Sequence, residues 1–155
     1  MKRNMVAALG SGIGLVLAGC AQTIGPGQNA EALQALATSR ACVSNLPPFG
    51  YWRYGGERFN QYYVPPNGTI TVGDDGGWCQ IQFQQFVGDA PAQFPLAVKD
   101  PPMHGEALVG SIGTSLRIAY RPVPGYVGED VFTVHMTGPQ PWDIPVHVVV
   151  VGRQP

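Results

Sequence analysis

The feature that most constrains the fold is a series of short strand-like runs that follows Pro66. Turn residues rich in glycine, proline, aspartate and asparagine separate these runs, which are β-branched or alternate apolar with polar residues. The runs cover residues 69–72, 78–83, 96–98, 106–109, 115–120, 131–136 and 144–151. Together with 21 glycines and 15 prolines, this spacing argues against a helical bundle and predicts an all-β sandwich.

The N-terminus has the layout of a secretory signal. A basic start, Lys2-Arg3, precedes an apolar run over residues 5–18. This run is shorter than the ~20 residues that a membrane-spanning helix needs. It ends in Leu17-Ala18-Gly19-Cys20, which resembles the lipobox of bacterial lipoproteins. The resemblance implies that the signal is cut before Cys20 and that this cysteine is acylated. An ordinary cleaved signal that contains a cysteine is the alternative.

The same resemblance implies where in the cell the protein is located. Each buried acyl methylene stabilises membrane attachment by ~0.8 kcal/mol, so the three chains of the lipoprotein family hold a protein firmly. Ala21 follows the cysteine, where inner-membrane lipoproteins of enteric bacteria favour aspartate. We therefore expect a lipid-anchored protein at the outer membrane of a Gram-negative bacterium.

The two remaining cysteines, Cys42 and Cys79, form an even pair in an exported chain. A bridge between them would close a loop worth about 4 kcal/mol in the chain-entropy model and would fasten the N-terminal segment to the core. Cys79 falls on the apolar side of its run, which places the bridge on the buried face. Two free thiols or a metal pair are the alternative.

Two segments raise a question of packing. Asn29 is a plausible cap for a helix over about residues 30–40, with Leu33 and Leu36 on one face. The last run, 144–151, is apolar on both faces. We expect that strand to be central in its sheet or to be covered, for instance by the N-terminal helix.

One stretch resembles a known family. Residues 120–134, with Gly125, Gly128, Asp130 and Phe132, resemble the conserved stretch of bacterial immunoglobulin-like and cadherin-like repeats. Pro102-Met103-His104-Gly105 is similar to the turn that often begins the same repeat. The resemblance covers about residues 90–152 and implies an immunoglobulin-like β-sandwich. In it, Asp130 would accept hydrogen bonds from the 121–128 loop, and Phe132 would be buried.

The segment that the strand pattern does not explain is rich in aromatic residues. Seven of the 15 aromatic residues lie between Phe49 and Val64, and prolines flank the segment on both sides. Its periodicity predicts an irregular or edge-strand segment. Tyrosine, tryptophan and arginine are enriched at interface hot spots, and aromatic rings also stack on sugars. The candidate binding residues are Tyr51, Trp52, Arg53, Tyr54 and Arg58. The favoured interpretation, however, is that these rings cover the sandwich and pack around Cys42 and Cys79, because small β domains often need an aromatic flap to complete their core.

The sequence contains no catalytic motif. It lacks the serine-nucleophile elbow, the zinc-protease motif and the phosphate-binding loop. His135 and His147 would share a face if the last two strands pair, but two imidazoles alone make a poor metal site. Asp74-Asp75 lacks the ligand order of a calcium loop and favours a plain turn. We expect no catalytic residue, no metal and no cofactor.

The composition also limits the partners. Loss of Lys2 and Arg3 with the signal changes the net charge from −1 to −3, so the chain offers no basic surface for nucleic acid. We expect a signal peptide at 1–19, a lipid-anchored spacer and short helix at 20–48, an aromatic-rich segment packed on the domain at 49–66, and the sandwich at 67–153. The expected role is non-catalytic, with an envelope protein as partner. A carbohydrate- or peptidoglycan-binding role for the aromatic segment is the alternative.

Overall fold

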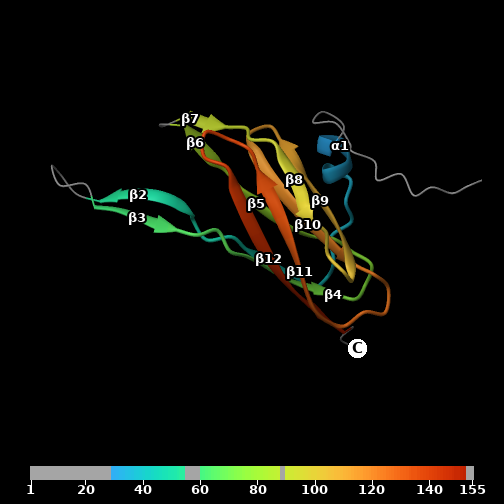
Figure 1. Cartoon of the computed structure of the whole chain (residues 1–155). Coiled ribbons are helices and arrows are strands. Elements are labelled where there is room, and N and C mark those ends of the chain that lie inside the picture. Colours follow the sequence, from blue (N-terminus) through green and yellow to red (C-terminus); the bar gives the residue numbers. More distant parts are fainter. Residues whose placement is uncertain (1–28, 55–59, 88–89, 153–155) are drawn as a thin grey trace, which may run out of the picture.

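The computed structural model describes residues 29–54, 60–87 and 90–152, and it confirms the predicted all-β class (Figure 1). The lipobox and Cys20 lie outside these residues and stay predictions. The described part contains a five-stranded sheet, a three-stranded sheet, two two-stranded sheets and one short helix. Its elements are α1 (Asn29–Gln34), β1 (Cys42–Asn45), β2 (Gly50–Tyr54), β3 (Asn60–Val64), β4 (Gly68–Gly73), β5 (Cys79–Phe83), β6 (Gln85–Val87), β7 (Ala90–Ala92), β8 (Leu96–Asp100), β9 (Gly105–Ile112), β10 (Ser115–Pro122), β11 (Gly128–Met136) and β12 (Trp142–Val151).

The five-stranded sheet has the order β1-β4-β12-β11-β8. All neighbours are antiparallel except β4 and β12, which are parallel. The strand that is apolar on both faces, β12, therefore lies in the centre of its sheet. This confirms the first of the two predicted alternatives, a central strand rather than a covered one. Its even-numbered residues from Ile144 to Val150 are buried, while His147 and Val149 face outward and are exposed.

The three-stranded sheet has the order β5-β10-β9, with antiparallel neighbours throughout. The two sheets face each other across one hydrophobic core, because a single cluster of buried residues draws on strands of both. Tyr120 and Phe132 are its largest fully buried side chains, and their rings stack with centroids 5.8 Å apart across the two sheets. The predicted burial of Phe132 is confirmed, since the residue is 1% exposed.

The predicted disulfide between Cys42 and Cys79 is present. It joins β1, at one edge of the five-stranded sheet, to β5, at one edge of the three-stranded sheet. Next to the bridge, the Ser44 hydroxyl donates a hydrogen bond to the Gln80 carbonyl at 2.6 Å. The bridge therefore closes one open side between the sheets, in addition to fastening the N-terminal segment.

The helix is shorter than predicted, because α1 ends at Gln34 rather than near Arg40. Residues 37–41, here called the strap, run extended beside the turn before β5. Ser39 donates its backbone N–H to the Trp78 carbonyl at 2.9 Å, and Trp78 donates to the Ala37 carbonyl at 2.8 Å. These tertiary hydrogen bonds replace the helical ones that the sequence pattern favoured.

The helix covers the outer face of the three-stranded sheet. Leu33 is 2% exposed and packs with Trp78 and Ala119, apart from the main core. The suggestion that it covers the last strand is therefore wrong, because β12 belongs to the other sheet. No helix among the described residues is long and apolar enough to cross a bilayer.

Two hairpins interrupt this arrangement. β2 pairs with β3 between β1 and β4, and β6 pairs with β7 between β5 and β8. Of the two predicted alternatives for the aromatic segment, irregular or edge-strand, the second is present: residues 50–54 and 60–64 form a two-stranded antiparallel ladder. Figure 1 shows that the β2–β3 hairpin extends away from the paired sheets.

Candidate functional site

Four of the predicted binding residues lie on one strand, since Tyr51, Trp52, Arg53 and Tyr54 belong to β2. The backbone register aligns this strand with β3, so that Tyr51 is opposite Tyr63 and Trp52 is opposite Tyr62. The side chains of residues 50–63, and Arg58 altogether, lie outside the described residues. The expectation that these rings pack on the domain and cover its core therefore stays a prediction.

The backbone shows that this hairpin is an insertion between neighbouring strands. β1 and β4 are adjacent and antiparallel, and Asn45 at the end of β1 is opposite Thr69 near the start of β4. Antiparallel neighbours can be joined by a two-residue turn. Here residues 46–67, which we call the arm, make the connection instead. The extra length is not needed to pair the two strands.

Both ends of the arm are fixed to the sheets. Phe49 is 8% exposed, and its ring meets the Trp142 ring edge-on with centroids 5.6 Å apart. It also packs against Phe83, at 6.2 Å. At the return, a Cβ added to Gly68 would come within 3.1 Å of the Ile81 and Val146 side chains, so the backbone there lies close against the core. The aromatic segment thus begins as core at Phe49, and the backbone of its β2–β3 hairpin then extends away from the paired sheets (Figure 1).

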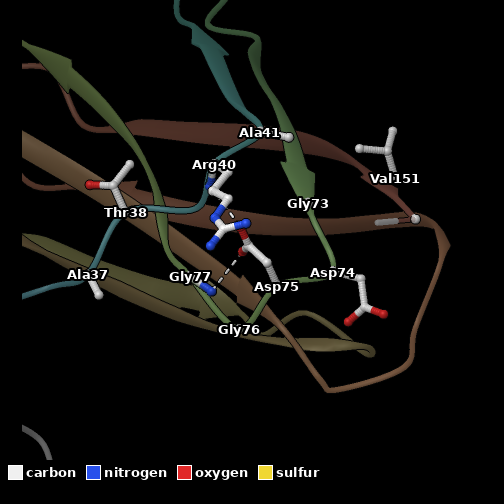
Figure 2. A pocket seen from close by; sticks show the side chains of 11 residues that line it. Ala37, Thr38, Arg40, Ala41, Gly73, Asp74, Asp75, Gly76, Gly77 and Val151 are labelled. Carbon is white, nitrogen blue, oxygen red and sulfur yellow. Dashed lines mark hydrogen bonds between the residues drawn. The ribbon is translucent and has the colours of Figure 1, made fainter. Parts of the chain in front are cut away.

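A pocket of about 730 Å³ lies at the turn between β4 and β5, where the strap crosses it (Figure 2). The Asp75 carboxylate accepts hydrogen bonds from the backbone N–H groups of Arg40 at 2.7 Å and Gly77 at 3.0 Å. These bonds, that from Arg40 first, hold the pKa of Asp75 below its ordinary value. A Cβ on Gly77 would lie 2.4 Å from the Ser39 backbone, so a glycine is required where the strap passes.

Asp74 likewise fixes a neighbouring loop. One of its carboxylate oxygens accepts a hydrogen bond from the Gly125 N–H at 3.1 Å. The two aspartates therefore fasten the strap and the 123–127 loop to this turn. No group of three or more His, Cys, Asp or Glu side chains that could hold a metal occurs in the described ranges.

The family-like stretch forms a buried polar network. Asp130 is 9% exposed and accepts hydrogen bonds from the backbone N–H groups of Met103 at 3.1 Å and His104 at 2.8 Å, and from the Tyr120 hydroxyl at 3.0 Å. The acceptor role was expected, but the 121–128 loop was the wrong partner, because Asp130 bonds the 102–105 turn instead. Burial first, and then Asp130, raise the pKa of Tyr120. A Cβ on Gly105 would lie 2.3 Å from the Tyr120 ring, which explains the glycine of this turn.

The two strand histidines face the same side of the five-stranded sheet but do not meet. His147 is opposite Val131 in the β11–β12 ladder, whereas His135 is opposite Asp143. The His135 Nδ1 atom lies 2.7 Å from Asp143, which also contacts the Lys99 ammonium at 2.5 Å. Lys99 first, and then His135, lower the pKa of Asp143. The three groups form an exposed polar cluster, in which Lys99 and Asp143 are an ion pair and His135 adds a hydrogen bond.

No protein-family model, curated protein or solved structure matches this chain. The function therefore has to be argued from the molecule alone.

Sequence reasoning selected the arm by its composition but missed that it is an insertion. The signal was present in the proline pairs Pro47-Pro48 and Pro65-Pro66, which flank the aromatic residues. Proline restricts the residue before it to extended or turn conformations, so a proline pair on each side can mark the two boundaries of a separate element. The adjacency of β1 and β4, however, is a long-range fact that the local pattern does not contain.

Proposed function

We propose that this chain is a non-catalytic, lipid-anchored envelope protein whose arm binds another envelope protein. The observation that carries the proposal is the arm itself, inserted where a two-residue turn would suffice. A two-stranded hairpin is at best marginally stable alone in water, so one that extends from its domain gains from a partner surface. Its tyrosine, tryptophan and arginine content suits a protein interface.

The domain that holds the arm is, in this proposal, an immunoglobulin-like sandwich. What supports this is the strand order. If β5 is taken as strand B, then β8 to β12 become strands C to G, and the sheets read B-E-D and G-F-C. These are the neighbours found in the immunoglobulin fold. β1 and β4 then form a first strand that is split by the arm, with β4 parallel to the last strand.

The anchor is Cys20, acylated after removal of residues 1–19, and the outer membrane of a Gram-negative cell is the proposed location. Eight residues separate Cys20 from Asn29, where the described chain begins. A fully extended chain spans at most ~3.5 Å per residue, so the domain stays within roughly 30 Å of its attachment point. A partner of the arm is therefore sought in the same membrane or next to it.

In-cell crosslinking tests the arm. A photo-crosslinking amino acid is placed at Trp52 in the full chain, and at Met103, which is 85% exposed and far along the chain from the arm, as the control. We expect the Trp52 position, but not the Met103 position, to give a discrete adduct with one envelope protein. A variant with residues 50–64 replaced by a short glycine–serine linker should lose that partner in co-purification. Equal adducts at both positions, or full retention by the linker variant, would contradict the proposal.

Two further measurements separate the parts of this proposal. A Cys20→Ser variant should leave the membrane fraction, and retention there would remove the lipid anchor but not the arm. Co-sedimentation with purified peptidoglycan tests the carbohydrate alternative, in which Tyr51, Trp52 and Tyr54 stack on sugars. Binding that Trp52→Ala abolishes would favour that alternative over a protein partner.

A further inference from the structure

A cleft of about 420 Å³ lies next to the root of the arm, between the β6–β7 hairpin and the loop that joins β11 to β12. Its aromatic lining comes from Phe86, Phe94 and Trp142. Its polar side chains belong to Gln85 and Gln140. This volume falls in the range of small-molecule sites, which combine apolar walls with a few polar groups. We call it the end cleft.

The aromatic walls of the end cleft are held from behind. Trp142 is packed edge-on against the buried Phe49, and its ring is only partly accessible. Phe94 is covered by the β11–β12 loop so closely that a Cβ on Gly138 would lie 2.9 Å from its ring. Phe86, by contrast, is 54% exposed. The cleft therefore has two fixed aromatic walls and one ring open to a ligand.

The polar groups of the end cleft are uncharged and unengaged. Gln85 and Gln140 make no side-chain hydrogen bond with the residues that the structure describes, and each amide offers both donors and an acceptor. Among the described residues that line the cleft there is no lysine, arginine, aspartate, glutamate or histidine. A ligand carrying a formal charge would lose hydration there without a compensating partner.

We propose that the end cleft binds a neutral saccharide unit. A pyranose ring presents a face of C–H groups, which fits an aromatic ring, and a rim of hydroxyl groups, which fits amides. A purely apolar ligand would form no hydrogen bond with either amide. An acidic sugar would bring a carboxylate with no cation to receive it. Only a neutral ligand with both an apolar face and hydrogen-bonding groups uses all of the lining.

This site is separate from the binding surface of the arm. Its described lining comes from β6, the end of β11, the start of β12, the loop between these two strands, and Phe94 before β8. A failure of the arm to bind a protein would leave the sugar site intact, and loss of sugar binding would leave the arm intact. The experiments on the two surfaces are therefore independent.

Saturation-transfer NMR on the full-length protein tests the proposal. The neutral probes are maltotetraose, cellotetraose and tetra-N-acetylchitotetraose, at millimolar concentration. Trigalacturonate serves as the acidic probe and toluene as the uncharged apolar one. We expect transfer to at least one neutral oligosaccharide and none to trigalacturonate. Transfer only to the apolar probe, equal transfer to the acidic sugar, or no transfer to any neutral sugar would overturn the assignment.

Variants then place the bound sugar. Phe86→Ala and Gln140→Ala should each weaken its binding by about three- to tenfold, the usual effect of losing one aromatic contact or one hydrogen bond. The controls are Met103→Ala, also an exposed apolar residue, and Gln82→Ala, an exposed glutamine on the outer face of the other sheet. Both should bind as the wild type does. Because Gln140 lies in an exposed loop, its variant keeps the fold, and unchanged binding by both cleft variants would place the sugar elsewhere.

Discussion

Loss of the Cys42–Cys79 bridge should remove a large part of the stability of this domain. The two cysteines are 37 positions apart, so the closed loop holds 38 residues, counting both ends. In the chain-entropy model a loop of that size restricts the unfolded chain by about 4 kcal/mol at 25 °C. The free energy of unfolding of a native domain is only about 5–15 kcal/mol, so loss of the bridge would remove a substantial fraction of it.

Urea unfolding, followed by tryptophan fluorescence to which the buried Trp78 contributes, measures this loss in two ways. Reduced wild type tests the covalent link alone, while a Cys42→Ala/Cys79→Ala variant also removes buried sulfur, since Cys79 is fully buried. We expect the reduced protein to lose about 4 kcal/mol and the double variant slightly more. Val43→Ala, on the same strand but 70% exposed, is the matched control and should change stability by less than about 0.5 kcal/mol. A reduced protein within about 1 kcal/mol of the oxidised one would refute the argument, because the strap and the β1–β4 ladder would then suffice.

Three further outcomes follow from the packing. Gly105→Ala should destabilise the domain by about 1–3 kcal/mol in urea unfolding, because its Cβ would lie 2.3 Å from the buried Tyr120 ring, whereas Gly152→Ala, with nothing closer than 3.8 Å, should be nearly neutral. The raised pKa of Tyr120 means that the folded state holds this proton longer than the unfolded chain, so stability should fall as the pH rises above about 10, and Tyr120→Phe should reduce that fall in unfolding titrations from pH 8 to 11. Leu33→Ala should cost about 2–4 kcal/mol if α1 covers the three-stranded sheet, and a loss under about 0.5 kcal/mol would mean that the helix is dispensable.

The local sequence pattern was sufficient to predict the longer strands. The seven runs that the sequence indicated correspond to β4, β5 and β8 to β12, because their apolar residues alternate and their ends carry turn residues. The local sequence pattern did not predict β1, β6 and β7, which have three or four residues each and no clear alternation of apolar and polar residues. Strands this short are held by their neighbours in the fold rather than by their own composition.

The errors in the site have the same origin. Asp130 was correctly expected to accept backbone hydrogen bonds, but its partners at Met103 and His104 are 27 and 26 positions away along the chain. Met103 and His104 precede β9, and they reach Asp130 in β11 only because β9 pairs with β10, the strand before β11. The end cleft was also missed, because its walls come from segments between positions 85 and 142 that share no motif.

Whether the arm is a binding element or a cover for the core is decided by comparing two variants. Replacing residues 50–64 with a short glycine–serine linker keeps Phe49 and the buried Pro66, which fix the two ends of the arm. Shortening a loop changes its closure entropy only slowly, so we expect this variant to unfold within about 1 kcal/mol of the wild type. Phe49→Ala keeps the whole hairpin but removes the ring that packs on Phe83 and Trp142, and it should cost about 3 kcal/mol or more. If the linker variant is instead the less stable of the two in the same urea titration, the hairpin belongs to the core and the proposal of a free binding arm is wrong.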